Sequence, residues 1–177
     1  MTEQKSSDKI ILALDQSTSA TGYCVFVNNR MVESGVFTPS IETSDEANNF
    51  YDRINDMGYQ ISQLVDRIKP TVVIMEDIQF QRNYGTYKRL ANLQGVIFTY
   101  LYLHQTPFLL VEVTKWKSYL GVLSKGRANQ KRDTKLRVRE IYNLEADEIT
   151  EDEADAIGIG HWAINNLIIT QPDESEG

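Results

Sequence analysis

Two carboxylates in this sequence stand at the ends of apolar runs that have the length of buried strands. Asp15 follows residues 10–14, and Glu76 follows residues 71–75. Uninterrupted runs of this kind are typical of strands that are covered on both faces. Because side chains alternate along a strand, only one of Glu76 and Asp77 can share the face of Asp15. We assign Glu76, since it ends the run.

The turn that follows Asp15, QSTSATG, consists of small and hydroxyl-bearing residues. An acid beside such a turn can hold a divalent cation or face a phosphate. It can also cap the turn with its own side chain. The other carboxylates described below favour a role for Asp15 in holding a cation.

A second pair of carboxylates lies in the sequence TEDEADAIGIG near the end of the chain. Thr150 and Glu153 match a capping box, which predicts a helix that begins here. Asp152 and Asp155 are three residues apart, so they project from one face of that helix. The helix dipole alone could explain acids in a first turn. It does not explain why they coincide with two strand-terminal acids.

Four carboxylates gathered at one point require a positive charge. Two of them about 4 Å apart repel by about 1 kcal/mol in water and by about 4 kcal/mol in a partly dehydrated site. Hard oxygen ligands select Mg²⁺ or Mn²⁺, and the sequence contains no cluster of histidines or cysteines that would favour zinc. We therefore predict a metal site made by Asp15, Glu76, Asp152 and Asp155.

The elements that must position these acids alternate between strands and helices, which predicts an α/β fold. The first three strands are joined by short turns and should form an antiparallel meander. Thr114 is the expected N-cap of a short helix that stops at Gly121. We expect strands at residues 10–14, 23–27, 31–37, 71–75 and 108–111, and helices at 45–69, 86–105, 115–120, 131–142 and from 151 onward.

The chain has 177 residues, which is enough for one domain with a substantial core. Its single cysteine, and the absence of a signal peptide or a membrane-spanning run, predict a soluble cytoplasmic protein without membrane contact. We expect a disordered tail at 1–8, the folded domain at 9–169 and a disordered acidic tail at 170–177.

Charge is distributed unevenly along the sequence. Residues 78–139 contain twelve bases and two acids, a net charge of +10, so the rest of the chain carries −17. Such polarisation favours a face that binds a polyanion such as nucleic acid, although these bases could also be the solvated sides of helices. The candidate DNA-binding bases are Arg82, Lys88, Arg89, Lys115, Lys117, Lys125, Arg127 and Lys131.

Aromatic residues are interleaved with a base at positions 78–85, IQFQRNYG. Phe80 in this segment could stack on an unpaired nucleotide, or it could fold back into the core.

Together these features resemble the RuvC-type Holliday junction resolvases of the RNase H-like superfamily, most closely their phage-borne members. The resemblance covers about residues 9–167 and includes YKRLANLQGV, VTKWKSYLG and KGRANQK. It implies an RNase H-like fold with a mixed five-stranded sheet flanked by helices. It also implies that Lys117 and Lys131 assist cleavage, with Lys115, Lys125 and Arg127 as alternatives. The stacking aromatic of the family corresponds to Phe80, one residue further on than expected.

The function implied by the resemblance is metal-dependent resolution of branched DNA. Asp15, Glu76, Asp152 and Asp155 would hold two Mg²⁺ ions, with Mn²⁺ able to substitute. Paired hydrolysis would leave 5′-phosphate and 3′-hydroxyl ends. The enzyme would be a homodimer without a nucleotide cofactor, acting in the bacterial host if it is phage-encoded.

Three other functions are weighed against this one. The stretch LALDQSTSATG also resembles the phosphate-binding turn of sugar kinases and actin-like ATPases, but this chain is too short for their second lobe. A non-catalytic module that binds branched DNA would not need the full set of acids. A related nuclease acting on forks, flaps or RNA would use the same acids.

Overall fold

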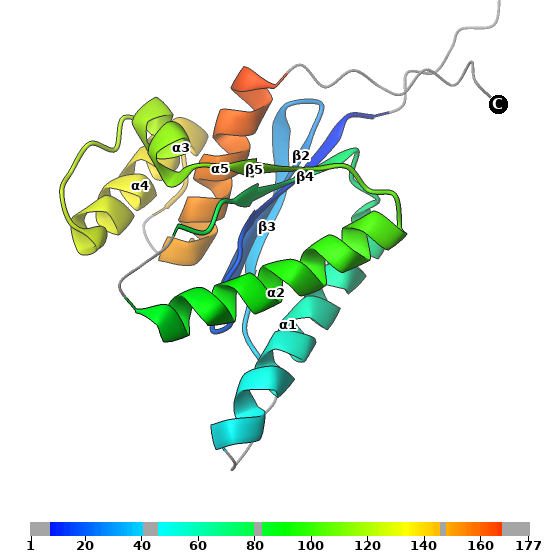
Figure 1. Ribbon diagram of the computed structural model, residues 1–177. Helices are drawn as coiled ribbons and strands as arrows, with labels where there is room; N and C mark the ends of the chain where they lie inside the picture. Colours follow the sequence, from blue (N-terminus) through cyan, green and yellow to red (C-terminus); the bar gives the residue numbers. More distant parts are fainter. Residues whose placement is uncertain (1–7, 41–45, 80–82, 146–147, 168–177) are drawn as a thin grey trace, which may run out of the picture.

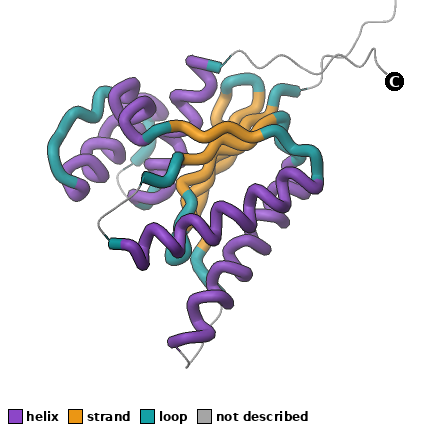
Figure 2. The backbone as a smooth tube through the Cα atoms, viewed as in Figure 1, coloured by secondary structure: helices purple, strands orange, loops and turns teal. Residues whose placement is uncertain are grey.

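A five-stranded mixed sheet forms the middle layer of the molecule (Figures 1 and 2). The computed structural model describes residues 8–40, 46–79, 83–145 and 148–167. The strand order is β3-β2-β1-β4-β5; β1 is antiparallel to β2 and parallel to β4. The strands are β1 (Ile10–Asp15), β2 (Thr21–Val27), β3 (Arg30–Phe37), β4 (Val72–Glu76) and β5 (Phe108–Val111). This arrangement confirms the predicted mixed sheet and its antiparallel start.

Strand register brings Asp15 and Glu76 side by side. Leu14 of β1 pairs with Met75 of the parallel strand β4, so the two acids that follow end neighbouring strands. Both strands are central and apolar, and residues 11–14 of β1 and 72–75 of β4 are buried. The carboxyl ends of parallel strands open at the same edge of a sheet, which is where such folds bind their ligands.

Different helices cover the two faces of the sheet (Figure 1). One face is covered by α1 (Glu46–Ile68) and α2 (Tyr84–Leu103), and the other by α3 (Val113–Leu120), α4 (Arg127–Tyr142) and α5 (Glu151–Asn166). Within β1, Leu12 and Leu14 pack toward α1 and α2, whereas Ile11 and Ala13 pack toward α5. Asp15 continues the second alternation and therefore belongs to the face of α5.

Helix α5 begins with the predicted capping box. Thr150 Oγ1 accepts from the Glu153 amide at 3.1 Å, and Glu153 Oε2 accepts from the Thr150 amide at 3.4 Å. The second carboxylate oxygen of Glu153 accepts from Ser34 of β3 at 2.7 Å. One buried side chain thus starts the helix and attaches it to the sheet.

Two glycines allow α5 to lie unusually close to the sheet. A Cβ atom on Gly22 of β2 would stand 2.0 Å from the carbonyl oxygen of Asp152. A Cβ atom on Gly160 would stand 2.3 Å from the ring of Phe26. Because Gly22 contacts the backbone of Asp152 directly, it sets the distance between that acid and the strand ends.

The starts of α2 and α3 differ from the predicted ones. α2 begins at Tyr84 and not at residue 86, because the Asn83 side chain accepts from the Thr86 amide and caps the helix earlier. The predicted N-cap of α3, Thr114, is wrong. Glu112 occupies that position without a side-chain cap bond, so no local signal marked it.

Helix α4 also begins earlier than predicted, at Arg127 and not at Lys131. Gly126 has a φ of 88°, a non-helical backbone conformation that glycine readily adopts, so the helix begins at the next residue. The four residues that follow, RANQ, contain no glycine, proline or β-branched side chain, so the helix extends through them. The predicted C-terminal stop of α3 is confirmed, since Gly121 adopts the left-handed conformation at φ 80°.

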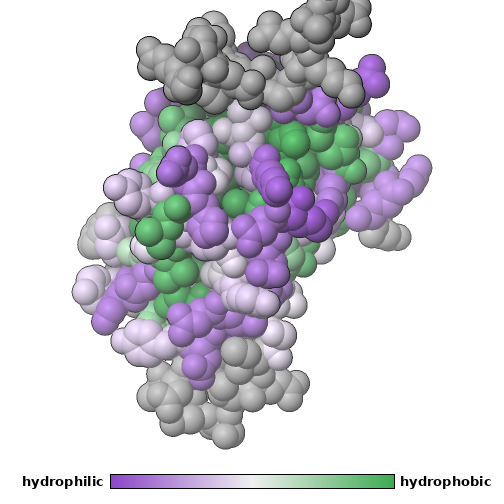
Figure 3. All heavy atoms as spheres, turned by 90° about the vertical axis from the view of Figure 1, so that its right-hand side faces the viewer, coloured by the Kyte–Doolittle hydropathy of each residue, from purple (hydrophilic) through white to green (hydrophobic). Residues whose placement is uncertain are grey.

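On the face shown in Figure 3, hydrophobic areas of the described residues alternate with hydrophilic ones. Among the described residues, no helix has the length and apolarity needed to cross a membrane. The predicted tails fall almost entirely outside the described residues. Asp8 is an exception, and its side chain accepts from Asn28 at 2.7 Å.

Substitution of Gly22 by alanine should destabilise the protein by about 1–3 kcal/mol, because the added methyl group collides with the backbone of α5. The free energy of unfolding from urea denaturation measures this loss.

The matched control is Gly95→Ala in α2, where an added Cβ meets nothing within 4 Å. Because alanine favours the helix more than glycine, this substitution should raise the free energy of unfolding by about 0.5–1 kcal/mol. Equal stability of Gly22→Ala and the unsubstituted protein would contradict the packing assigned to Gly22.

Candidate active site

The predicted acids converge at the carboxyl ends of β1 and β4. Burial raises the pKa of Asp15 well above its ordinary value, and the charges of Glu76, Asp155 and Asp152 raise it further, while Lys131 lowers it. Coulombic influence of this kind requires proximity. Two strand-terminal acids and two helix-borne acids, far apart in the sequence, therefore share one electrostatic environment.

The pKa values of Glu76 and Asp155 are also raised. Burial raises the pKa of Glu76 to about 7; a hydrogen bond from Trp116 opposes this, and the charge of Asp155 adds to it. Burial also raises the pKa of Asp155, whose side chain is 5% exposed, although Lys117 and Lys131 lower it. Without nearby positive charge, the cluster would favour proton uptake near neutral pH.

One carboxylate oxygen in this cluster has unused hydrogen-bonding capacity. Asp155 Oδ1 is buried and has no hydrogen-bond partner among the described residues. The Thr134 side chain also acts on this carboxylate and lowers its pKa, but an unpaired oxygen on a buried acid beside other acids suits a hard cation. In the side-chain positions described, however, no three acidic, histidine or cysteine residues converge closely enough to hold an ion. At Asp152 an ammonium group supplies the positive charge.

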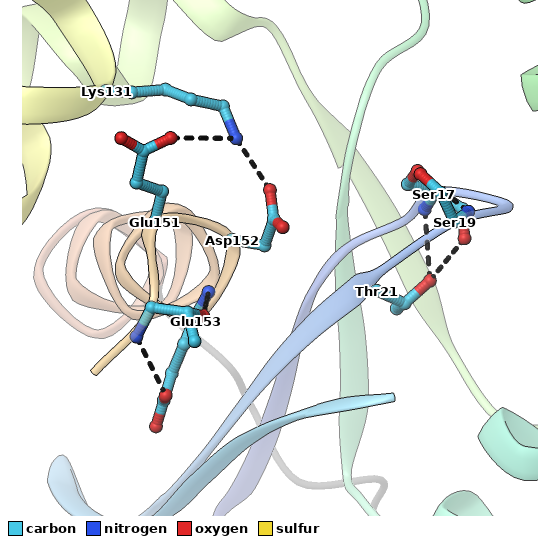
Figure 4. A network of polar contacts seen from close by, with 8 residues as sticks. Ser17, Ser19, Thr21, Lys131, Glu151, Asp152 and Glu153 are labelled. Carbon is cyan, nitrogen blue, oxygen red and sulfur yellow. Dashed lines mark hydrogen bonds and ion pairs between the residues drawn. The ribbon is translucent and has the colours of Figure 1, made fainter. Parts of the chain in front are cut away.

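That ammonium group belongs to Lys131 of α4. Its Nζ lies 2.6 Å from Asp152 Oδ1 and 3.9 Å from Glu151 Oε2 (Figure 4). Burial lowers the pKa of Lys131, but the bond to Asp152 and the other acids outweigh burial and leave it above its ordinary value. Lys117 of α3 is buried, and its charge acts on both Glu76 and Asp155. The two lysines predicted to assist cleavage therefore lie beside the acids.

The alternative bases lie in different settings. Arg127, at the start of α4, is exposed, and its charge lowers the pKa of Glu76. Lys115 is exposed and pairs with Glu112 at 3.6 Å, and Lys125 is exposed in the loop before α4. Arg127 therefore acts on an acid of the cluster.

The remaining predicted DNA-binding residues come from the segment that follows β4. Phe80 and Arg82 lie outside the described residues. Lys88 and Arg89 are exposed in the first turns of α2, and the Arg89 guanidinium lies 5.8 Å from the ring centroid of Phe50. Their role in binding stays a prediction.

The hydroxyl-rich turn after Asp15 is closed by its own side chains (Figure 4). Thr21 Oγ1 accepts from the Ser17 amide at 3.0 Å and donates to the Ser17 carbonyl at 2.7 Å. Ser17 and Ser19 share a hydroxyl contact of 3.1 Å. Thr21 thus performs the capping that Asp15 could have performed, which leaves Asp15 to the acid cluster.

Three buried residues of the site were not predicted from sequence. The Trp116 indole donates to Glu76 Oε2 at 2.9 Å. Gln16 and Gln94 donate their side-chain amides to the backbone carbonyl of Glu76 at 2.6 and 3.3 Å. The only available signals were the position of Gln16 next to Asp15 and a tryptophan inside a short basic helix.

Substitution of Asp155 by asparagine should stabilise the protein in the absence of divalent cations. The folded pKa of Asp155 is raised, so the stability associated with its protonated form is present below the unfolded pKa and is lost as pH rises through the folded value. The gain should be small near pH 4 and on the order of 1 kcal/mol near pH 8. Urea denaturation in EDTA at the two pH values measures it.

Asp77→Asn is the control, since Asp77 is adjacent to Glu76 but lies outside the predicted set of four acids. The gain in the free energy of unfolding should be smaller in this variant than in Asp155→Asn. A gain of equal size in both variants would contradict the electrostatic cluster.

Comparisons with known proteins identify the family of this chain. The sequence model of the family "Crossover junction endodeoxyribonuclease RuvC" matches residues 11–162. The RuvC of Dictyoglomus turgidum is 29% identical over 154 residues, covering 85% of this chain and 92% of the relative. The RuvC of Dictyoglomus thermophilum is 28% identical over 150 residues, with the same coverage.

Solved structures show the same fold. T. thermophilus RuvC in complex with a Holliday junction substrate matches with a TM-score of 0.68 at 16% identity, over 86% of this chain and 91% of that one. The yeast mitochondrial Holliday junction resolvase Ydc2 matches with a TM-score of 0.60 at 17% identity, over 87% and 78%. Since the family model spans nearly the whole described domain, the chain belongs to the RuvC family of crossover junction endodeoxyribonucleases.

Proposed function

We propose that this protein resolves Holliday junctions and related branched DNA by hydrolysing phosphodiester bonds at Asp15, Glu76, Asp152 and Asp155. The observation that carries the proposal is the convergence of acids from β1, β4 and α5 with raised pKa values and an unpartnered buried oxygen on Asp155. Strongly shifted pKa values that arise from burial and neighbouring charges cluster at functional sites.

The donor set fits Mg²⁺, with Mn²⁺ as a substitute, because it consists of carboxylate oxygens alone. Asp15, Glu76, Asp152 and Asp155 would hold two ions. The chemistry that such ions supply is activation of the attacking water and stabilisation of charge on the leaving 3′ oxygen. The products would carry 5′-phosphate and 3′-hydroxyl ends.

The lysines complete the charge balance at the scissile phosphate. Lys117 is buried beside Glu76 and Asp155, so its ammonium can offset negative charge that develops on the phosphate. Lys131 binds Asp152 in this structure and can exchange that carboxylate for a phosphate oxygen. Each ammonium group would donate hydrogen bonds to phosphate oxygens.

The bound DNA would contact the bases of α2, α3 and α4. Lys88, Arg89, Lys115, Lys125 and Arg127 are exposed on these elements or beside them, and Arg82 and Phe80 belong to the segment before α2. The bases would contact phosphates, and Phe80 would stack on a base at the branch point.

Two symmetric cuts require two active sites, so we propose a homodimer with an isologous interface. The two Dictyoglomus relatives are bacterial, which supports the bacterial cytoplasm as the place of action. The phage origin stays a prediction.

Substitution of Asp15 or Asp155 by asparagine should reduce cleavage of a labelled four-way junction in Mg²⁺ on the order of a thousandfold, because several kcal/mol of transition-state stabilisation are lost. Binding of the junction in Ca²⁺ should be unchanged. Single-turnover cleavage and gel-shift assays measure the two effects.

Asp77→Asn should cut at the normal rate, and EDTA should stop all cutting by the unsubstituted protein. Linear duplex and RNA serve as competing substrates. Preferred cutting of either would exclude junction resolution and favour a different nuclease, and binding without any cutting would favour a non-catalytic module.

Substitution of both Lys125 and Arg127 by alanine should weaken junction binding and reduce the slope of log affinity against log salt by about 2, since each contact releases about one counterion. Fluorescence anisotropy over a salt series gives the slope.

Arg30→Ala is the matched control. Arg30 is exposed in the β2–β3 hairpin, at the opposite end of the sheet from Asp15. An equal loss of affinity in the control would mean that the predicted basic face does not define the binding surface.

A further inference from the structure

We infer that Trp116 is a positioning residue that fixes the carboxylate of Glu76 and thereby sets the affinity of the site for divalent cations. The inference rests on the proposed function, since it assigns Trp116 a role toward the same ions. It concerns a residue that lies outside the acid set and does not touch the reacting phosphate.

The indole N–H of Trp116 determines which oxygen of Glu76 is available. It donates to Oε2 at 2.9 Å, from a side chain that is fully buried. A bond to one carboxylate oxygen restricts rotation of the group and leaves Oε1 for other ligands. Residues that bond to metal-binding groups in this way orient them and tune their basicity.

The indole ring is itself held by α5. A Cβ atom on Gly158 would stand 2.8 Å from Cζ3 and 3.2 Å from Cε3 of Trp116, so only glycine leaves room for the ring. Gly158 follows Asp155 by three residues and therefore lies about one turn further along α5. The ring thus contacts the helix that carries Asp155 and bonds to the strand that carries Glu76.

The neighbouring residue joins the same arrangement. Lys117 is buried, its Nζ lies 5.0 Å from the centroid of the Trp116 ring, and its charge acts on both Glu76 and Asp155. An ammonium group over an indole face is attracted by the ring. Trp116 therefore contributes to the placement of an acid and of a base.

If Trp116 served only to fill the core, phenylalanine would preserve an aromatic, apolar side chain, and the cost would be the cavity left by the smaller ring. What phenylalanine lacks is the N–H donor, and a buried indole N–H normally needs an acceptor. The substitution Trp116→Phe therefore separates packing from positioning.

The test measures Mg²⁺ binding by isothermal titration calorimetry on the full chain without DNA. Trp116→Phe should raise the dissociation constant about 10- to 100-fold, the usual effect of removing a bond to a metal-binding group. Trp162→Phe is the matched control, because Trp162 is the other of the two tryptophans and packs at the far part of α5. The control should bind Mg²⁺ like the unsubstituted protein.

A second readout uses the fluorescence of Trp116. In Trp162→Phe, Trp116 is the remaining tryptophan, so paramagnetic Mn²⁺ should quench its emission along the same curve that calorimetry gives for Mn²⁺. This measurement does not require Trp116→Phe to fold. Heat of binding without quenching would overturn the inference.

The outcomes separate the two proposals. An unchanged Mg²⁺ dissociation constant in a folded Trp116→Phe protein would overturn the role of Trp116 and leave the proposed function intact. If the unsubstituted protein neither binds Mg²⁺ nor cuts a junction, both proposals are overturned.

Discussion

Repulsion among carboxylates at the ends of β1 and β4 is the constraint on which the rest of this structure depends. Asp15, Glu76 and Asp155 lie in a poorly hydrated place, where the charges of Glu76 and Asp155 raise the pKa of Asp15 and the charge of Asp155 raises the pKa of Glu76. The backbone must therefore be fixed by contacts elsewhere. The buried apolar strands hold Asp15 and Glu76 in place. The close approach of α5 to Gly22 places the start of that helix beside the strand ends.

Residues outside the sheet offset the repulsion among these carboxylates. Helices α3 and α4 bring Lys117, Lys131 and Arg127 toward the acids, and the Trp116 indole bonds to Glu76. These groups are anchored on helices that pack against α5, so they are organised before any ligand arrives. Helices α1 and α2 cover the opposite face of the sheet, and the start of α2 carries exposed bases.

Sequence predicted those features that depend on local pattern. Apolar runs located β1 and β4, and the Thr150–Glu153 capping box located the start of α5. The starts of α3 and α4 were placed wrongly, because Glu112 and Gly126 form N-caps without side-chain bonds. The contacts of Trp116, Gln16 and Gln94 with Glu76 join distant segments, so no local pattern encodes them.

The ion pair between Lys131 and Asp152 gives the acid cluster an internal counter-ion. An incoming cation must compete with an ammonium group 2.6 Å from the carboxylate. Under the proposed function, a DNA phosphate offers that ammonium another partner and so releases Asp152. Cation and DNA are then thermodynamically coupled, and each raises the affinity for the other. On that proposal, the full set of acids would become available to cations when the substrate is bound.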